Sequence, residues 1–318
     1  MTEQLKDLIF RQDLDISGLD KDVIKETKKE MKAKKEKHYN ELLEAVSDEL
    51  DEKGKRLLSC AKEKGASSWL SALPIRKFGY SINKQEFKDA VNLRYGWKIA
   101  DLPAFCGCGS RNGIDHTLVC KKGGYVSMRH NALRDLMGKM MEEVCKDVVI
   151  EPILLPVDEN EVEGNTSENA RLDIAARGVW RGYERTFFDV RVTHPTANSH
   201  MKKSLENLYK ENEDEKKRLY GERVRNSEKG MFTPLVFTTT GGMGNECSRL
   251  TKKLANLIAN KTGESYPDVM RHMRTRLRFA LLRSTLVAIR GYRGRVEKDK
   301  EEPLGDISFN LIPEVRDF

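Results

Sequence analysis

The sequence lacks any apolar run that approaches the ~20 residues of a membrane-spanning helix. Its first residues, MTEQLKDLIFRQDLD, contain no basic stretch followed by an apolar core, so we expect no secretory signal. No segment repeats at a fixed period, which argues against a solenoid or a repeat array. These absences predict an intracellular protein that does not enter a membrane.

Charge is abundant in the chain but only mildly unbalanced. The 318 residues include 57 basic and 50 acidic side chains, giving a net charge of +7, and 38% are hydrophobic. The apolar share suffices for one core, while the high charged share predicts solvated helices outside it. A small positive excess does not by itself indicate nucleic-acid binding. Its placement is more informative, because eight arginines and no acids lie between Val269 and Val296.

Composition divides the chain into four parts. Residues 1–66 are dense in charge and predict one or two solvated helices that could bind a protein partner. A basic arm is the alternative, but acids are interleaved throughout this part. Residues 67–125 contain an expected helix, Asn83–Tyr95, followed by a cysteine-rich loop. Residues 126–295 have the pattern of an α/β core, and 296–318 form a C-terminal tail.

The core region alternates between helical and strand-like periodicity. Its pattern predicts a helix at 129–144, strands at 148–155, 172–176 and 186–193, a helix at 201–226, a strand at 233–239, and helices at 246–261 and 266–288. Trp180–Gly182 lies in a turn between the second and third strands and predicts a hairpin. This order indicates a mixed α/β (α+β) fold with a small mixed sheet flanked by helices.

Three of the six cysteines crowd into a glycine-rich loop with one histidine. Cys106, Cys108, His116 and Cys120 offer three thiolates and an imidazole, a ligand set of structural zinc sites. In a reducing compartment such crowding favours a metal over a disulfide. The loop is also too poor in apolar residues to fold on burial alone. The single residue between Cys106 and Cys108 is a short spacing, so a turn with free cysteines is the competing interpretation.

Two aspartates lie inside apolar, strand-like runs. Asp173 in RLDIA and Asp189 in FFDVRV predict a cradle for Mg²⁺ or Mn²⁺ if both face one side of adjacent strands. Such an ion can polarise a phosphodiester and generate a hydroxide nucleophile. Glu151 in VIEPIL interrupts an apolar run in the same way and is a third candidate ligand. Alternation along a strand also permits these acids to be solvated on an exposed face.

Basic side chains near the acids would stabilise negative charge on a phosphate. Arg191 lies two residues after Asp189, on the same strand face. Arginine stays protonated, so it can clamp a phosphate but cannot act as a base. Lys202 and Lys203, at the start of the next expected helix, are alternative catalytic cations. Each of these residues could also be an ordinary surface charge.

Several motifs in this order resemble the C-terminal restriction-like endonuclease region of non-LTR retrotransposon proteins. They are CGCGSRNGIDHTLVC, GGYVSMRHN, IEP, RLDI and FDVRV. The family region joins a Cys-Cys-His-Cys knuckle, an Arg-His-Asp/Asn element and a PD-(D/E)XK-type nuclease core. The likeness extends over about residues 67–290, where SSWLSALPIRKFGYSINKQEF and FTPLVFTTTGGMG resemble retroelement-derived open reading frames.

The resemblance implies a nuclear, Mg²⁺- or Mn²⁺-dependent endonuclease that nicks target DNA. Asp173 and Asp189 match the two motif aspartates, and Arg129-His130-Asn131 matches the Arg-His element. Cys106, Cys108, His116 and Cys120 match the knuckle and its zinc. No Tyr-x-Asp-Asp polymerase motif is present, so the chain does not resemble the reverse transcriptase itself.

The chain departs from the family pattern at two motif positions. Leu172 stands where proline is usual, and Arg191 stands where the motif lysine is expected. That lysine can move to the following helix in this family, which implies Lys202 or Lys203.

Contacts with DNA are expected from five basic residues, with RNA as an open alternative. They are Arg129 and His130 of the Arg-His element and Arg271, Arg274 and Arg278 of the C-terminal helix. The same arginines could instead solvate an amphipathic helix. Three hypotheses therefore stand: an endonuclease, an inactive nucleic-acid-binding remnant of the same fold, and a zinc-stabilised scaffold for a protein partner.

Overall fold

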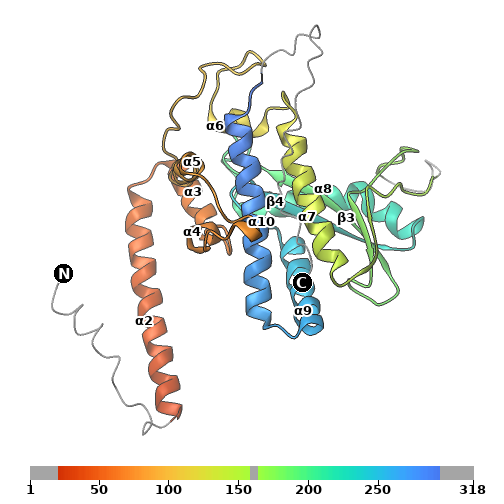
Figure 1. Cartoon of the computed structure of the whole chain (residues 1–318), viewed down its shortest axis with the longest axis horizontal. Coiled ribbons are helices and arrows are strands. Elements are labelled where there is room, and N and C mark those ends of the chain that lie inside the picture. Colours follow the sequence, from red (N-terminus) through yellow and green to blue (C-terminus); the bar gives the residue numbers. More distant parts are fainter. Residues whose placement is uncertain (1–20, 158–163, 294–318) are drawn as a thin grey trace, which may run out of the picture. The chain divides into compact units, whose positions relative to one another are not determined.

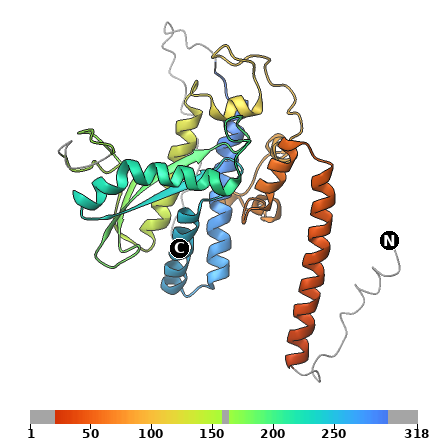
Figure 2. The same ribbon diagram turned by 180° about the vertical axis from the view of Figure 1, so that it is seen from behind.

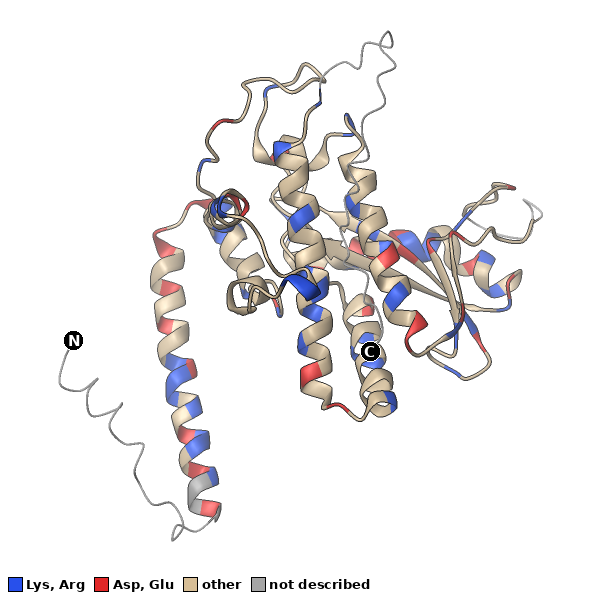
Figure 3. Ribbon diagram, viewed as in Figure 1, with Lys and Arg blue, Asp and Glu red and all other residues tan. Residues whose placement is uncertain are grey.

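The computed structural model describes residues 21–157 and 164–293. The expected C-terminal tail, 296–318, therefore lies outside the described residues. The chain divides into two compact units, Met1–Asp51 and Glu52–Phe318. In the first unit, α2 (Lys21–Asp48) is a helix of 28 residues with basic and acidic side chains interspersed along it (Figure 3). This part of the charged N-terminal region is helical, as its composition predicts.

The second unit begins with short helices that lead to the cysteine loop. They are α3 (Glu52–Lys62), α4 (Ser68–Ser71), the 3₁₀ helix η2 (Arg76–Phe78) and α5 (Lys84–Tyr95). α5 begins at the N-cap Asn83, whose side chain accepts a hydrogen bond from the Glu86 N–H while the Glu86 carboxylate accepts one from the Asn83 N–H. This reciprocal capping fixes the start of the helix. Arg290 then ties α5 to the C-terminal helix, because its guanidinium donates to both oxygens of the buried Asp89.

The remaining elements form a mixed α+β core. In chain order they are α6 (Ile114–Val119), α7 (Tyr125–Glu142), β1 (Lys146–Ile150), β2 (Ile174–Arg177), β3 (Arg185–Thr193), α8 (Leu205–Asn226), β4 (Met231–Thr238), α9 (Asn245–Thr262) and α10 (Tyr266–Arg290). The sheet order is β1-β2-β3-β4, with antiparallel pairing among the first three strands and parallel pairing of β3 with β4. The predicted fold class, a small mixed sheet flanked by helices, is confirmed.

Helices cover both faces of the sheet. α7, α9 and α10 pack on one face, with α7 in front of the sheet in Figure 1. α8 packs on the other face, which is turned towards the viewer in Figure 2. Among the described residues, no helix is both long and apolar enough to cross a membrane.

Side-chain alternation along β3 decides where its acid points. Phe188 and Val190 are buried against α7, α9 and α10, whereas Phe187 is buried on the face of α8. Each buried phenylalanine contributes roughly 1.5–3 kcal/mol, so these contacts fix the register of the strand. Because alternate residues share a face, Asp189 and Arg191 lie on the same side as Phe187, under α8.

Candidate active site and metal centre

Neighbouring strands bring Asp173 and Asp189 together. The antiparallel register pairs Ile174 of β2 with Phe188 of β3, so the next pair of opposite positions is Asp173 and Asp189. The Asp173 N–H donates to the carbonyl of Phe188 at 3.0 Å, which holds Asp173 in register although β2 begins one residue later. The two expected acids are therefore neighbours in the fold.

Asp189 lies in a buried, charged environment. Only 7% of the residue is exposed, and its Oδ2 lies 2.7 Å from Nζ of Lys216 in α8. Burial raises the pKa of Asp189, the positive charge of Lys216 opposes that rise, and the negative charge of Asp173 adds to it. Paired acids of this kind, with one pKa raised by burial and a like charge, are common where a protein does chemistry.

Asp173 and the backbone of β3 converge on His130. Oδ2 of Asp173 accepts the Val190 N–H at 2.5 Å and lies 3.1 Å from Nε2 of His130. The same nitrogen lies 3.0 Å from the carbonyl oxygen of Val190. The hydrogen bond with Asp173 raises the pKa of His130, although burial opposes it. The Asp173 carboxylate and the Val190 carbonyl thus both converge on the ring nitrogen of His130.

Glu151 is next to this group, but its carboxylate turns elsewhere. Its N–H donates to the carbonyl of Asp173 at 2.9 Å. The carboxylate is half exposed and forms ion pairs with Arg134 and Arg171. Its φ of +53° lies in the left-handed region, which is uncommon for a residue with a side chain. The backbone of Glu151, the third expected acid, therefore lies beside Asp173, while its carboxylate pairs with arginines.

The expected catalytic cations are placed differently from Lys216. Nη1 of Arg191 lies 3.3 Å from Oε1 of Glu215, which holds its guanidinium. Lys202 is exposed, and Lys203 pairs with Glu211; both lie in the turn before α8 rather than on the helix. No ion pair in the described structure joins either lysine to Asp173 or Asp189. The lysine that contacts Asp189 is Lys216, about three turns into α8.

Lys216 was missed because α8 is polar along its whole length. The helix still has a buried stripe, formed by Leu208, Tyr209, Asn212, Glu213, Arg223 and Val224. Lys216 is four residues after Asn212 and three after Glu213, so it lies on the same side of the helix as these buried residues. A helical wheel drawn from Leu208 and Val224 would have placed it towards the sheet.

The second candidate site is the Cys/His cluster. The ligand atoms of Cys106, Cys108, His116 and Cys120 all lie within 4.8 Å of one another. The Sγ atoms of Cys106 and Cys120 are 3.8 Å apart, and Sγ of Cys108 is 3.3 Å from Nε2 of His116. Zinc with Zn–S bonds of about 2.3 Å separates two sulfurs of a tetrahedron by about 3.8 Å. These four residues could bind a metal such as zinc.

The short Cys-x-Cys spacing is accommodated by a tight turn. The Gly109 N–H donates to the carbonyl of Cys106, and Gly109 adopts a φ of +92° that favours glycine. The turn brings Cys108 next to His116, while Cys106 reaches Cys120. His116 and Cys120 lie one helical turn apart at the end of α6, since the Cys120 N–H donates to the carbonyl of His116.

Two of the expected DNA-contacting arginines are buried. Arg129 is 2% exposed and donates to the carbonyl of Leu118, and Arg278 is 8% exposed and donates to that of Ala66. Neither guanidinium is presented on the surface where the backbone of a DNA duplex would lie, so these expectations are corrected. Arg278 is buried because α10 is packed on most of its sides, and Arg129 is buried on α7; both guanidinium groups donate to backbone carbonyls. Arg271 is exposed and Arg274 is half-buried, so both stay open to solvent.

No protein-family model and no curated protein matches the chain. A functional conclusion therefore depends on the geometry of the aspartate pair and the Cys/His cluster, together with the motif resemblance.

Proposed function

We propose that the chain is a metal-dependent DNA endonuclease with a restriction-like, PD-(D/E)XK-type core, derived from a non-LTR retroelement. The observation that carries the proposal is the placement of Asp173 and Asp189 opposite one another on neighbouring strands, with Lys216 on Asp189. The element order supports it as well: a helix, three antiparallel strands, a helix and a parallel strand. We place its action in the nucleus because its proposed substrate is target DNA.

The residues at the pair fit a hard divalent cation. Asp189 is a buried carboxylate with a raised pKa, and a cation beside it would favour its charged form. Asp173 and Asp189 would hold Mg²⁺ or Mn²⁺, and the Val190 carbonyl is a further oxygen near Asp173. When bound, such an ion lowers the pKa of a coordinated water and neutralises charge on the phosphate.

The protein's own groups supply the remaining requirements of phosphodiester hydrolysis. Lys216 carries a positive charge beside Asp189, where it would stabilise negative charge developing on a phosphate oxygen. His130 holds the Asp173 carboxylate in position through a hydrogen bond. Arg191 is restrained by Glu215 on the same face and can contact a neighbouring phosphate.

The Cys/His cluster is proposed to bind a structural zinc that supports the nuclease core. His116 and Cys120 are the cluster residues in α6 and at its end, and the carbonyl of Leu118 between them accepts a hydrogen bond from Arg129 of α7. The next residue of α7 is His130, which contacts Asp173. Zinc would thus fix a loop that adjoins the aspartate pair. DNA is the proposed partner, and a protein partner for the N-terminal helices stays a prediction.

The test is nicking of supercoiled circular DNA by the purified, zinc-loaded chain. We expect Mg²⁺ to support conversion to the open circle, a chelator to stop it, and Mg²⁺ alone to restore it. Asp173→Asn and Asp189→Asn should abolish nicking and leave DNA binding intact. Asp147→Asn is a matched control, because Asp147 is an exposed acid at β1 that pairs with Arg177.

Two outcomes would replace the proposal. A chain that binds DNA but nicks no duplex with Mg²⁺ or Mn²⁺ is a catalytically inactive remnant. A chain that binds zinc and no nucleic acid is a scaffold.

A further inference from the structure

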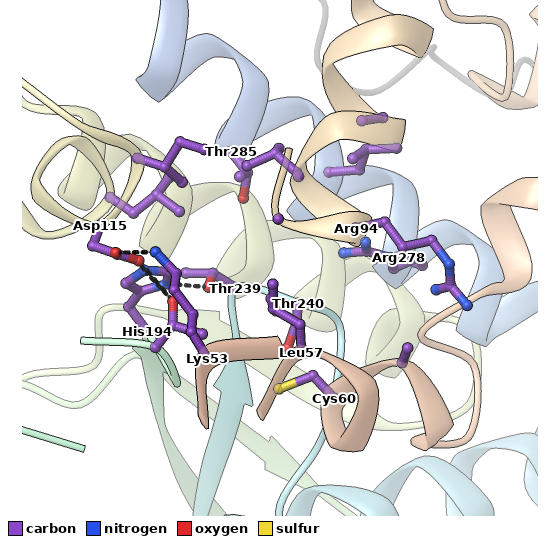
Figure 4. Close-up of a pocket in the computed structure, with 18 residues that line it drawn as sticks. Lys53, Leu57, Cys60, Arg94, Asp115, His194, Thr239, Thr240, Arg278 and Thr285 are labelled. Carbon is purple, nitrogen blue, oxygen red and sulfur yellow. Dashed lines mark hydrogen bonds and ion pairs between the residues drawn. The ribbon is translucent and has the colours of Figure 1, made fainter. Parts of the chain in front are cut away.

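A cavity lined by both apolar and polar side chains lies at the ends of β3 and β4. It has a volume of about 70 Å³ and is lined by residues of α3, α5, α6 and α10 and of the segments that follow the two strands (Figure 4). This space is large enough for several waters or one small polyatomic ion. His194 lines it and follows Asp189 by five residues, so it lies roughly 16 Å from Asp189 along the chain.

Asp115 supplies the carboxylate among the residues that line this cavity, and its oxygens are already bonded. Oδ1 accepts the Thr196 hydroxyl at 2.7 Å and lies 2.9 Å from Nε2 of His194. Oδ2 accepts Nζ of Lys53 at 2.5 Å, as Figure 4 shows. Lys53 and Asp115 therefore neutralise each other. The Asp115 carboxylate does not neutralise Arg94 or Arg278, the two arginines that line the cavity.

Arg278 is a buried cation with no carboxylate partner among the described residues. Its Nε donates to the Ala66 carbonyl at 2.8 Å. Its Nη1 is buried and has no hydrogen-bond partner among the residues that the structure describes. Burial, together with the positive charge of Arg94, which also lines the cavity, lowers the pKa of Arg278 to about 10. Two guanidinium groups without an anion are costly to keep in a partly desolvated space.

A hydroxyl in the same cavity also lacks a partner. Thr285 is 4% exposed, and its Oγ1 makes no hydrogen bond within residues 21–157 and 164–293. The loop after β4 packs on Arg278 at Gly241, whose φ is +101°. A Cβ at Gly241 would lie 2.6 Å from Cδ of Arg278, so this close approach requires glycine.

We propose that this cavity binds a phosphate-sized oxyanion through Arg278, Arg94 and Thr285. The anion would accept from Nη1 of Arg278 and from the Thr285 hydroxyl and would neutralise the two arginines. It is either free orthophosphate or the terminal phosphate of a nucleic-acid strand, since both present the same group. The site goes beyond the nuclease proposal, because none of these three residues takes part in it.

Binding of radiolabelled orthophosphate by the full-length, zinc-loaded chain tests the site directly. Equilibrium dialysis without Mg²⁺ and at constant ionic strength should show saturable binding. Arg94→Met should weaken binding about tenfold or more, because a charge-assisted contact is lost. Thr285→Val should weaken it about three- to tenfold, the range for one neutral hydrogen bond. Lys252→Met, at an exposed position of α9, should leave it unchanged.

The Arg94 and Thr285 variants avoid removing the buried Arg278, whose loss could unfold the chain. Circular dichroism of each variant controls for folding. Competition with a 5′-phosphorylated oligonucleotide and its 5′-hydroxyl twin separates the two sources. Preference for the phosphorylated strand assigns the site to a nucleic-acid end, and displacement by free phosphate alone assigns it to the small anion.

Either of two results overturns the proposal. One is the absence of saturable binding at millimolar phosphate, and the other is equal binding by the folded Arg94→Met and Thr285→Val variants. The assay contains no Mg²⁺ and measures no cleavage, so its failure is distinct from failure of the nuclease proposal.

Discussion

Nζ of Lys216 lies 2.7 Å from Oδ2 of Asp189, and this ion pair joins α8 to β3 beside Asp173. Both side chains are largely buried, so the ammonium is held in place rather than solvated. We expect Lys216→Met to lower the nicking rate on the order of 100-fold, the effect of losing one charge-stabilising donor. Single-turnover nicking at saturating protein measures this change.

Lys203→Met is the matched control for Lys216→Met. Lys203 pairs with Glu211 before α8, so its loss should change the nicking rate less than threefold, within the range of a surface substitution. Lys216→Arg should retain part of the activity, because it keeps the charge. Equal rates for the folded Lys216→Met and Lys203→Met variants would remove Lys216 from the catalytic account.

The two aspartates were predictable from the sequence, whereas the lysine that pairs with Asp189, Lys216, was not. Asp173 and Asp189 interrupt short apolar runs, and a period of two defines which face of a strand each residue occupies. Lys216 lies in a helix dominated by charged residues, where only a weak stripe indicates the buried side. Its partner is on another element, so the contact depends on how α8 packs on the sheet.

The Cys/His cluster and the basic helix show the same contrast. Cys106, Cys108, His116 and Cys120 are close in sequence, so a local loop brings them together. The burial of Arg278 is a tertiary property, because its carbonyl partner, Ala66, is remote in sequence. A count of arginines could not distinguish buried carbonyl contacts from exposed charges.

Removal of one ligand from the Cys/His cluster should release zinc and destabilise the chain. We expect Cys120→Ser to lower the free energy of unfolding by several kcal/mol, since structural zinc contributes directly to folding. Cobalt substitution should give the absorption of a tetrahedral thiolate site in the wild type and lose it in the variant. Metal analysis and chemical denaturation measure both effects.

Cys145→Ser is the control for the zinc prediction. Cys145 is half-buried and lies outside the cluster, so this variant should keep its zinc. A wild-type chain that binds no zinc or cobalt would contradict the assignment.

The exposed end of α10 is the part of that helix that can still contact nucleic acid. Charge reversal at Arg271 and Arg274 should weaken binding to all DNA sequences alike, because phosphate contacts carry little sequence information. The slope of log affinity against log salt should fall by about 2 if each arginine neutralises one phosphate. Fluorescence anisotropy over a salt series measures it, with Arg177→Glu and Arg181→Glu of the β2–β3 hairpin as control. An unchanged slope would assign these arginines to the solvated surface.

Glu63 should make stability depend on pH. Burial raises its pKa from 4.5 to about 6, against the hydrogen bond from Tyr209 and the charge of Arg56. The folded chain therefore binds this proton more tightly than the unfolded chain, and stability falls as pH rises from 4.5 to about 6. The expected loss is on the order of 1–2 kcal/mol after allowance for partial exposure.

Glu63→Gln keeps an acceptor for the Tyr209 hydroxyl and removes the titration. Urea unfolding of both proteins across this pH range gives the difference between them, in which other titrating groups cancel. A difference that does not change with pH would contradict the assignment.

The most direct measurement of the central claim is anomalous diffraction from crystals of the chain soaked in Mn²⁺. The account predicts a Mn²⁺ peak coordinated by the carboxylates of both Asp173 and Asp189, and its loss in Asp189→Asn crystals. A wild-type map without a peak at this pair, under conditions where the chain binds DNA, would contradict the claim that the two aspartates share a catalytic cation.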